Sequence, residues 1–141
     1  MILALLDRLR DRRRRKLWAP GQATGRRGED LAHRYLRRHG YIVVARNYRL
    51  SAGDAEADII AWDGSELVIV EVKTRETDAF GPPDRAIGDD KRRALQRIGR
   101  EYTRKSNTPE DQVRCDVVTV ILAPKPCIEL FRNAVRLTDT T

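Results

Sequence analysis

A chain of 141 residues is long enough for one compact domain and too short for two ordinary ones. About 40% of the residues are hydrophobic, which supplies a modest core, but no apolar run approaches the roughly 18 residues that a membrane-spanning helix needs. The net charge of +7 belongs to residues 1–27, which hold nine basic and two acidic residues, because the other 114 residues hold nineteen of each.

Residues 1–22 are predicted to form a basic N-terminal arm, and residues 23–141 the folded domain. A basic run at 12–16 follows apolar residues at helical spacing, namely Ile2, Leu5, Leu6 and Leu9. The arm is either an amphipathic helix that docks on a membrane surface, a protein partner or nucleic acid, or a solvated extension. No small-residue cleavage site closes the opening apolar stretch, so we expect no export.

The two cysteines also indicate that the protein is not exported. Cys115 and Cys127 form no CxxC pattern and have no histidine at ligand spacing, so we expect no structural zinc site. Unpatterned cysteines suit a reducing cytoplasm, where they behave as small hydrophobic residues. We therefore predict a cytoplasmic protein.

The folded domain reads as helix, three strands, helix and two strands, which is the α/β class. The first helix is predicted over 24–39 with Gly40 after its end, and the first strand over 41–45, continuing into 46–49. Strands at 57–62 and 66–74 are joined by the hairpin signal Asp63-Gly64. A second helix, capped by Asp89 or Asp90, precedes two strands that are predicted over 113–122 and 128–135.

Two carboxylates and a lysine are predicted to converge on the hairpin. Side chains alternate along a strand, so Glu71 and Lys73 share a face, and Asp58 on the paired strand can point to it too. Carboxylates are hard ligands for Mg²⁺, which also holds phosphate oxygens and lowers the pKa of bound water. Lys73 can orient that water or stabilise developing charge. The pattern suits phosphodiester hydrolysis, although the spacing also fits a simple Glu71–Lys73 salt bridge.

Two further features bear on this choice. Glu29 lies at the start of the apolar stripe of the first helix and can reach the sheet as a third carboxylate, although the helix dipole also favours an acid there. The second helix is basic, which predicts either a phosphate-binding face or a solvated surface. Its basic residues are Lys91, Arg92, Arg93, Arg97, Arg100, Arg104 and Lys105.

Several short motifs occur in a fixed order along the chain. They are Gly28-Glu29, Asn47-Tyr48-Arg49, Glu56-x-Asp58-Ile-Ile, Val70-Glu71-Val72-Lys73-Thr74-Arg75 and Arg114-x-Asp116-Val117-Val118. Over residues 25–137 this series resembles the bacterial YraN-like family. That family is similar to the PD-(D/E)XK nucleases and stands close to archaeal Holliday-junction resolvases.

The resemblance implies a restriction-endonuclease-like core, in which helices flank a mixed β-sheet. It implies that Asp58 is the aspartate of the motif, that Glu71 and Lys73 are its (D/E)xK pair, and that Glu29 is an additional acid on a helix. These four residues would be catalytic, with Glu29, Asp58 and Glu71 binding Mg²⁺ or Mn²⁺ and Lys73 assisting the water. The chain departs from the family pattern at Ala55, Ala57 and Cys115, where Gly, Ile and Phe are usual.

We therefore predict a Mg²⁺-dependent nuclease that hydrolyses DNA, in branched or processed structures. The residues predicted to contact nucleic acid are Arg75, Lys91, Arg93, Arg97 and Arg100. One alternative is a non-catalytic nucleic-acid-binding module with the same fold, and another is an adaptor that docks through its N-terminal arm. Because resolvase-like proteins often act as dimers, the resemblance also leaves open a homodimer.

Overall fold

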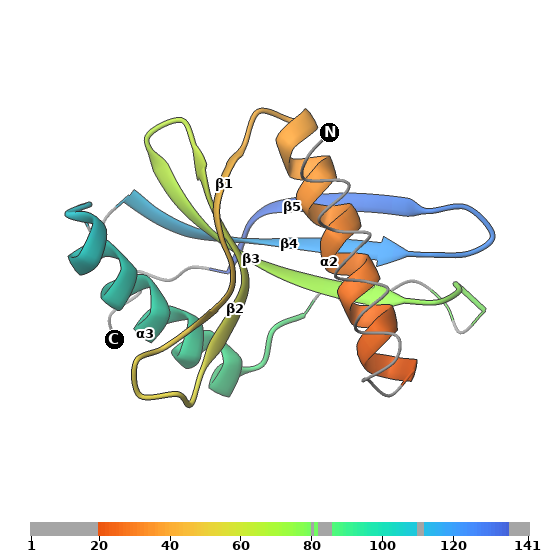
Figure 1. The fold of residues 1–141 in the computed structure, drawn as a ribbon, viewed down its shortest axis with the longest axis horizontal. Coiled ribbons are helices and arrows are strands. Elements are labelled where there is room, and N and C mark those ends of the chain that lie inside the picture. The colour runs from red at the N-terminus through yellow and green to blue at the C-terminus, as the bar shows by residue number, and fades with distance from the viewer. Residues whose placement is uncertain (1–19, 80, 82–85, 110–111, 136–141) are drawn as a thin grey trace.

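The computed structural model describes residues 20–79, 81, 86–109 and 112–135. These residues form a five-stranded sheet with one helix on each face (Figure 1). The helices are α2 (Pro20–Arg38) and α3 (Asp89–Ser106), and neither is long and apolar enough to cross a membrane. The strands are β1 (Ile42–Arg49), β2 (Glu56–Asp63), β3 (Glu66–Arg75), β4 (Val113–Ile121) and β5 (Cys127–Val135).

The sheet is mixed and follows the order of the chain, β1-β2-β3-β4-β5. The pairs β1–β2, β2–β3 and β4–β5 are antiparallel, whereas β3 and β4 are parallel and α3 lies between them in sequence. A parallel pair needs a long crossover, and a helix supplies it. The predicted α/β class and element order are therefore confirmed.

Alternation along the central strands divides the core into two layers. On β3, Val68 and Val70 pack with Ala32 and Leu36 of α2, and other residues of β2 and β4 complete that layer. Leu67 and Ile69 point to the opposite face, where Leu95 and Ile98 of α3 cover them. Because both faces are covered, β3 has an uninterrupted apolar run from Leu67 to Val70, as buried strands do.

Both helix starts differ from the sequence prediction. Helix α2 begins at Pro20, since proline has no N–H to lose and suits a first helical turn. Residues 20–22, which we assigned to the arm, thus belong to α2, and the rest of the arm lies outside the described residues. The prediction that Asp89 or Asp90 caps α3 is wrong. Gly88 is the N-cap without a side-chain bond, and both acids lie in the first turn, where the helix dipole favours them.

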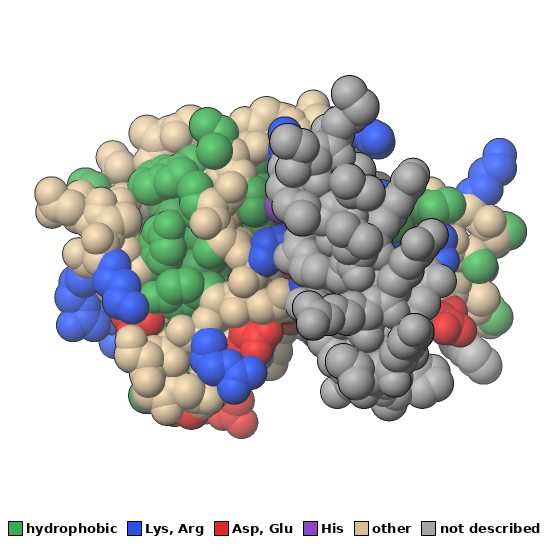
Figure 2. Space-filling model, in the orientation of Figure 1, with side chains coloured by type: hydrophobic (Ala, Val, Ile, Leu, Met, Phe, Trp, Pro, Cys, Tyr) green, Lys and Arg blue, Asp and Glu red, His purple; other side chains and the backbone are tan. Residues whose placement is uncertain are grey.

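Strand β1 forms one edge of the sheet and carries exposed apolar side chains. Ile42 is 66% exposed and Val44 is 42% exposed. Hydrophobic side chains gather over this part of the sheet in Figure 2. The β1–β2 register shifts between Val43 and Ala45, and such a bulge twists an edge away from pairing with another chain.

Candidate functional site

Three carboxylates meet at one end of the sheet, and we call Glu29, Asp58 and Glu71 the acid cluster. Glu29 comes from α2, Asp58 from β2 and Glu71 from β3. The β2–β3 ladder runs from Asp63–Glu66 to Ile59–Val70. Just beyond it, Asp58 Oδ2 accepts a hydrogen bond from the Val72 backbone N–H at 2.8 Å. The side chain of Asp58 therefore bonds to β3 just past the ladder, which fixes one carboxylate beside Glu71.

A close approach of α2 to β3 brings Glu29 into the cluster. A Cβ atom on Gly28 would lie 1.8 Å from Thr74 Oγ1, so only glycine fits against β3 at this position. Arg26 then pairs with Glu29 Oε2 at 3.1 Å, and Arg46 of β1 lies 3.8 Å from the same oxygen. Glycine thus allows the approach, and the two guanidinium groups orient the carboxylate.

Asn47 is a polar residue of the site that the sequence analysis did not single out as functional. It lies within β1 at φ 51°, which is the left-handed region that asparagine tolerates better than most residues. With its amide nitrogen facing the acids, Asn47 donates to Glu29 Oε2 at 3.2 Å and to Glu56 Oε1 at 3.1 Å. The available signal was the polar stretch of residues 46–49 within a predicted strand, although polarity alone gives no backbone angle.

Burial raises the pKa values of all three acids, and the charge of Asp58 raises those of Glu29 and Glu71 further. Burial, the charge of Asp58 and a hydrogen bond with Asp58 raise the pKa of Glu29 to about 8. Burial and the charge of Asp58 raise the pKa of Glu71 to about 7. Burial also raises the pKa of Asp58, against the Val72 N–H and the charge of Lys91. The cluster therefore exchanges protons near neutral pH.

The two lysines near the cluster differ in their contacts. Lys91 of α3 lies 3.3 Å from Glu71 Oε2 and donates to the Glu56 backbone carbonyl at 3.0 Å. We predicted Lys91 as a nucleic-acid contact, and the structure places its ammonium against an acid. Lys73 lies two residues after Glu71 on β3 and lowers the pKa of Glu71, but it makes no ion pair within the described residues.

The remaining predicted phosphate contacts lie on α3 and at the end of β3. Arg93 pairs with Asp90, and Arg97 makes two bonds to Asp54, at 2.8 and 3.2 Å. Arg100 is exposed and forms no ion pair in the described part of the chain. On β3, Arg75 donates to the Gly81 carbonyl at 3.4 Å. Of Arg93, Arg97 and Arg100, two thus already have an acidic partner.

The acid cluster has the chemistry of a cation site but is partly closed by basic groups. Among the described residues, no three His, Cys, Asp or Glu side chains are already arranged as a metal-binding group. Arg26 faces Glu29, and Lys91 faces Glu71. Glu71 Oε2 is buried and, within the same residues, accepts no hydrogen bond of good geometry. One carboxylate oxygen therefore retains capacity for a ligand.

The chain is similar to a set of bacterial proteins. Residues 28–120, which contain the acid cluster, match the family described as "Uncharacterised protein family UPF0102". A UPF0102 protein of Solibacter usitatus is 48% identical over 133 residues, which cover 94% of this chain and 99% of that protein. A UPF0102 protein of Koribacter versatilis is 47% identical over 114 residues, covering 79% and 78%. One from Syntrophus aciditrophicus is 42% identical over 115 residues, covering 81% and 89%.

Proposed function

We propose that this chain, which belongs to the uncharacterised protein family UPF0102, is a divalent-cation-dependent nuclease with a restriction-endonuclease-like core. The observation that supports this best is the burial of Glu29, Asp58 and Glu71 in one cluster with raised pKa values. Burying several carboxylates together costs stability unless cations compensate them. Strongly perturbed acids beside specific charged partners are typical of functional sites.

The donor set fits Mg²⁺ or Mn²⁺. Hard cations prefer carboxylate oxygens, and Glu71 Oε2 is a buried oxygen without a well-formed hydrogen bond in the described residues. Asp58 and Glu71 would hold the ion, with Glu29 as the third acid. When bound, the ion would lower the pKa of a water and offset charge on the phosphate.

The residues of the chain would each carry a part of the reaction. A water oxygen forms a bond to phosphorus, the bond from phosphorus to the leaving oxygen breaks, and a phosphate monoester and a hydroxyl result. The Val72 N–H already holds the Asp58 carboxylate in place, so Asp58 would lose little conformational entropy in the reaction. Glu29, with a pKa of about 8, is mostly protonated near neutral pH and can donate a proton to the leaving oxygen, while the attacking water releases one. Lys73 would offset negative charge on the reacting phosphate.

DNA is the substrate class that the basic groups around the site suit. Lys91 lies near the start of α3, and Arg75 is the last residue of β3, which carries Glu71. Arg93, Arg97 and Arg100 follow Lys91 along α3. Such groups bind phosphates without reading sequence, which suits recognition of branched or processed structures by shape. The proposal includes a cytoplasmic location, since Cys115 and Cys127 are free thiols. A homodimer stays a prediction.

The test is cleavage of a panel of labelled duplex, flap, four-way-junction and single-stranded DNA. Each substrate is incubated with Mg²⁺, with Mn²⁺ and with a chelator, using the wild type and Asp58→Asn. Asparagine keeps an acceptor for the Val72 N–H but removes the charge, so cleavage should be lost while folding persists. Asp89→Asn is the matched control, because Asp89 is 81% exposed on α3, and it should cleave like the wild type.

A non-catalytic nucleic-acid-binding module is the second candidate. The contacts of Arg26 with Glu29 and of Lys91 with Glu71 favour it, because they occupy the acids with basic side chains. This candidate predicts that the wild type binds the same DNA panel but yields no product under any cation condition. That outcome would reject the nuclease proposal.

A further inference from the structure

Lys91 reaches the acid cluster from the side opposite to Glu29. It lies in the first turn of α3, and its side chain is 38% exposed, whereas that of Glu71 is only 11% exposed. Its ammonium donates to the Glu56 carbonyl at 3.0 Å and lies 3.3 Å from Glu71 Oε2. A long flexible stem that starts at the surface therefore carries a positive charge to a largely buried acid.

The contact between Lys91 and Glu71 is an ion pair without a well-directed hydrogen bond. Glu71 Oε2 accepts none of good geometry from the described residues, even though the ammonium is close. Such a pair depends on charge, and the ammonium can leave it without breaking a fixed network. Among the described residues, the Lys91 ammonium donates one hydrogen bond, to the Glu56 carbonyl.

Lys91 is also the main lysine charge acting on the two strand acids. It lowers the pKa of both Asp58 and Glu71, and its effect on Glu71 exceeds that of Lys73. Lys73 follows Glu71 on the same strand but forms no ion pair within the described residues. The two lysines therefore differ in kind, since one contacts an acid and the other only lies near it.

We propose that Lys91 is an exchangeable counter-ion of the acid cluster. Its ammonium neutralises Glu71 until a divalent cation takes its place, and the released ammonium then binds a phosphate of the nucleic acid. This inference rests on the proposed function. A dication and an ammonium repel each other strongly at one carboxylate, so the cation frees Lys91, and nucleic acid that holds Lys91 in turn favours the cation. Cation and nucleic acid then reinforce each other's binding, as reciprocal linkage requires.

The variant that tests this is Lys91→Met, which keeps an unbranched apolar stem and removes the charge. Mn²⁺ affinity is measured by calorimetry on the full chain without DNA. DNA affinity is measured by fluorescence anisotropy, with and without Mn²⁺, on a duplex with phosphorothioate linkages that resist hydrolysis. We expect Lys91→Met to bind Mn²⁺ several-fold more tightly than the wild type. We also expect Mn²⁺ to raise the DNA affinity of the wild type by about 5-fold or more, and that of Lys91→Met far less.

Two controls separate direct competition from a general charge effect. Lys73→Met removes a positive charge close to Glu71 without removing a contact, so its Mn²⁺ affinity should rise less and Mn²⁺ should still strengthen DNA binding. Lys91→Gln keeps a donor for the Glu56 carbonyl, and it replaces Lys91→Met if that variant fails to fold by circular dichroism. It should show the same pattern.

The outcomes distinguish this inference from the proposed function. If the wild type binds Mn²⁺ and both Lys91 variants bind it no more tightly, Lys91 is not an exchangeable counter-ion, while the nuclease proposal stands. If neither the wild type nor any variant binds Mn²⁺, both proposals fail. If the Lys91 variants bind Mn²⁺ and the wild type does not, the result would support the competition and would mean that Lys91 keeps Mn²⁺ from Glu71 in the wild type.

Discussion

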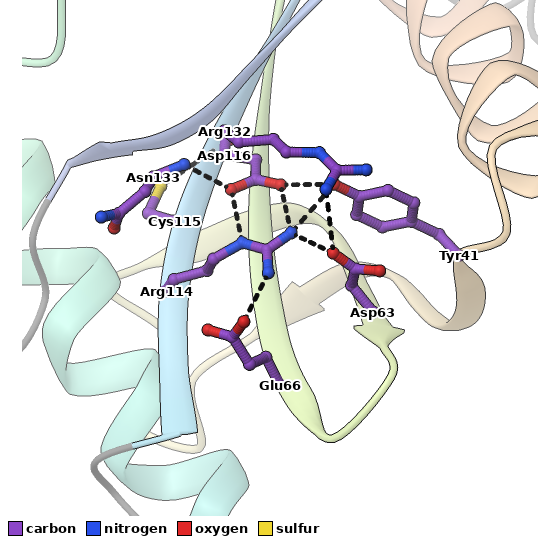
Figure 3. A network of polar contacts seen from close by, with 8 residues as sticks. All are labelled: Tyr41, Asp63, Glu66, Arg114, Cys115, Asp116, Arg132 and Asn133. Atoms are coloured by element: carbon purple, nitrogen blue, oxygen red, sulfur yellow. Dashed lines mark hydrogen bonds and ion pairs between the residues drawn. The ribbon is translucent and has the colours of Figure 1, made fainter.

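Arg114 and Asp116, two residues apart on β4, form a buried ion pair in which Arg114 Nε donates to Asp116 Oδ1 at 3.0 Å (Figure 3). Asp116 is fully buried and also accepts bonds from the Tyr41 hydroxyl and the Asn133 backbone N–H, both at 2.8 Å. Arg114 continues to Asp63 at 2.6 Å and to Glu66 at 3.0 Å. This network joins β2, β3, β4 and β5 to Tyr41, the residue just before β1. It lies at the end opposite to the acid cluster, since Asp63 and Asp58 are roughly 16 Å apart along β2 at about 3.3 Å per residue.

The first prediction is that Arg114→Met destabilises the fold strongly without affecting the acid cluster. It leaves Asp116 as a buried carboxylate without its cation, which typically costs about 3–5 kcal/mol. Arg132→Met is the matched control, because Arg132 is 57% exposed and lies 3.7 Å from Asp63, so it should cost less than about 1 kcal/mol. Urea unfolding measures both. Equal stability of the two variants would show that the buried pair does not stabilise the fold.

The second prediction concerns the contact that places Glu29. Gly28→Ala puts a methyl group 1.8 Å from Thr74 Oγ1, so α2 must move away from β3. We expect a loss of about 1–3 kcal/mol in the free energy of unfolding, together with weaker Mn²⁺ binding because Glu29 moves with the helix. The double variant Gly28→Ala/Thr74→Gly should recover part of the cation affinity.

Gly25→Ala provides the control on the same helix. Nothing lies within 4 Å of a Cβ at Gly25, so this change should stabilise the protein by up to about 1 kcal/mol through helix propensity. Both variants are compared by thermal unfolding and calorimetry. If Gly28→Ala were as stable as Gly25→Ala, the close approach of α2 to β3 would not position Glu29.

The strands could be predicted from sequence because their patterns are local. Apolar runs and the Asp63-Gly64 signal predicted the hairpin, and in the structure Asp63 pairs with Glu66 across a turn at Gly64 and Ser65. The start of α2 was harder to predict, because a Pro-Gly pair such as Pro20-Gly21 often marks a break between elements. In the structure Pro20 is the first residue of α2, a position where proline is favoured.

The partners of the charged residues could not be predicted, because they lie far apart in sequence. Arg97 and Asp54 are 43 residues apart, and Lys91 and Glu56 are 35 residues apart. Composition correctly indicates that α3 is basic. It does not indicate which cations are already paired, since pairing depends on how the loop before β2 lies against the helix.

The third prediction follows from the Arg97–Asp54 pair. Arg97 must give up two bonds to Asp54 before it can bind a phosphate, whereas Arg100 has no acidic partner among the described residues. Arg100→Gln should therefore weaken DNA binding more than Arg97→Gln does. Asp54→Asn should strengthen DNA binding and steepen its salt dependence by about 0.9 in log–log slope, which is one phosphate contact. Anisotropy titrations from low to moderate salt measure both, and an unchanged slope in Asp54→Asn would exclude Arg97 as a phosphate contact.

The last prediction is that the protein loses stability as pH rises through neutrality when no divalent cation is present. The pKa of Glu29 is about 8 in the folded protein against an ordinary value near 4.5, and that of Glu71 is about 7. Between pH 4.5 and about pH 8, the folded protein therefore binds more protons than the unfolded chain. Protonation of the two acids thus stabilises the fold fully below pH 4.5, and this stabilisation is lost as pH rises through about 7 and 8.

We therefore expect the free energy of unfolding to fall between pH 5.5 and 8.5, by on the order of 5 kcal/mol, since each unit by which a pKa is raised is worth about 1.4 kcal/mol. Glu29→Gln cannot ionise, so it should flatten this dependence, most clearly near pH 8, while Asp89→Asn should leave it unchanged. The proposed cation site needs the ionised acids, so Mn²⁺ should stabilise the wild type more at pH 8.5 than at pH 5.5. Urea unfolding in a chelator and in Mn²⁺ measures each slope, and equal slopes for the wild type and Glu29→Gln would mean that Glu29 is not held protonated by the cluster.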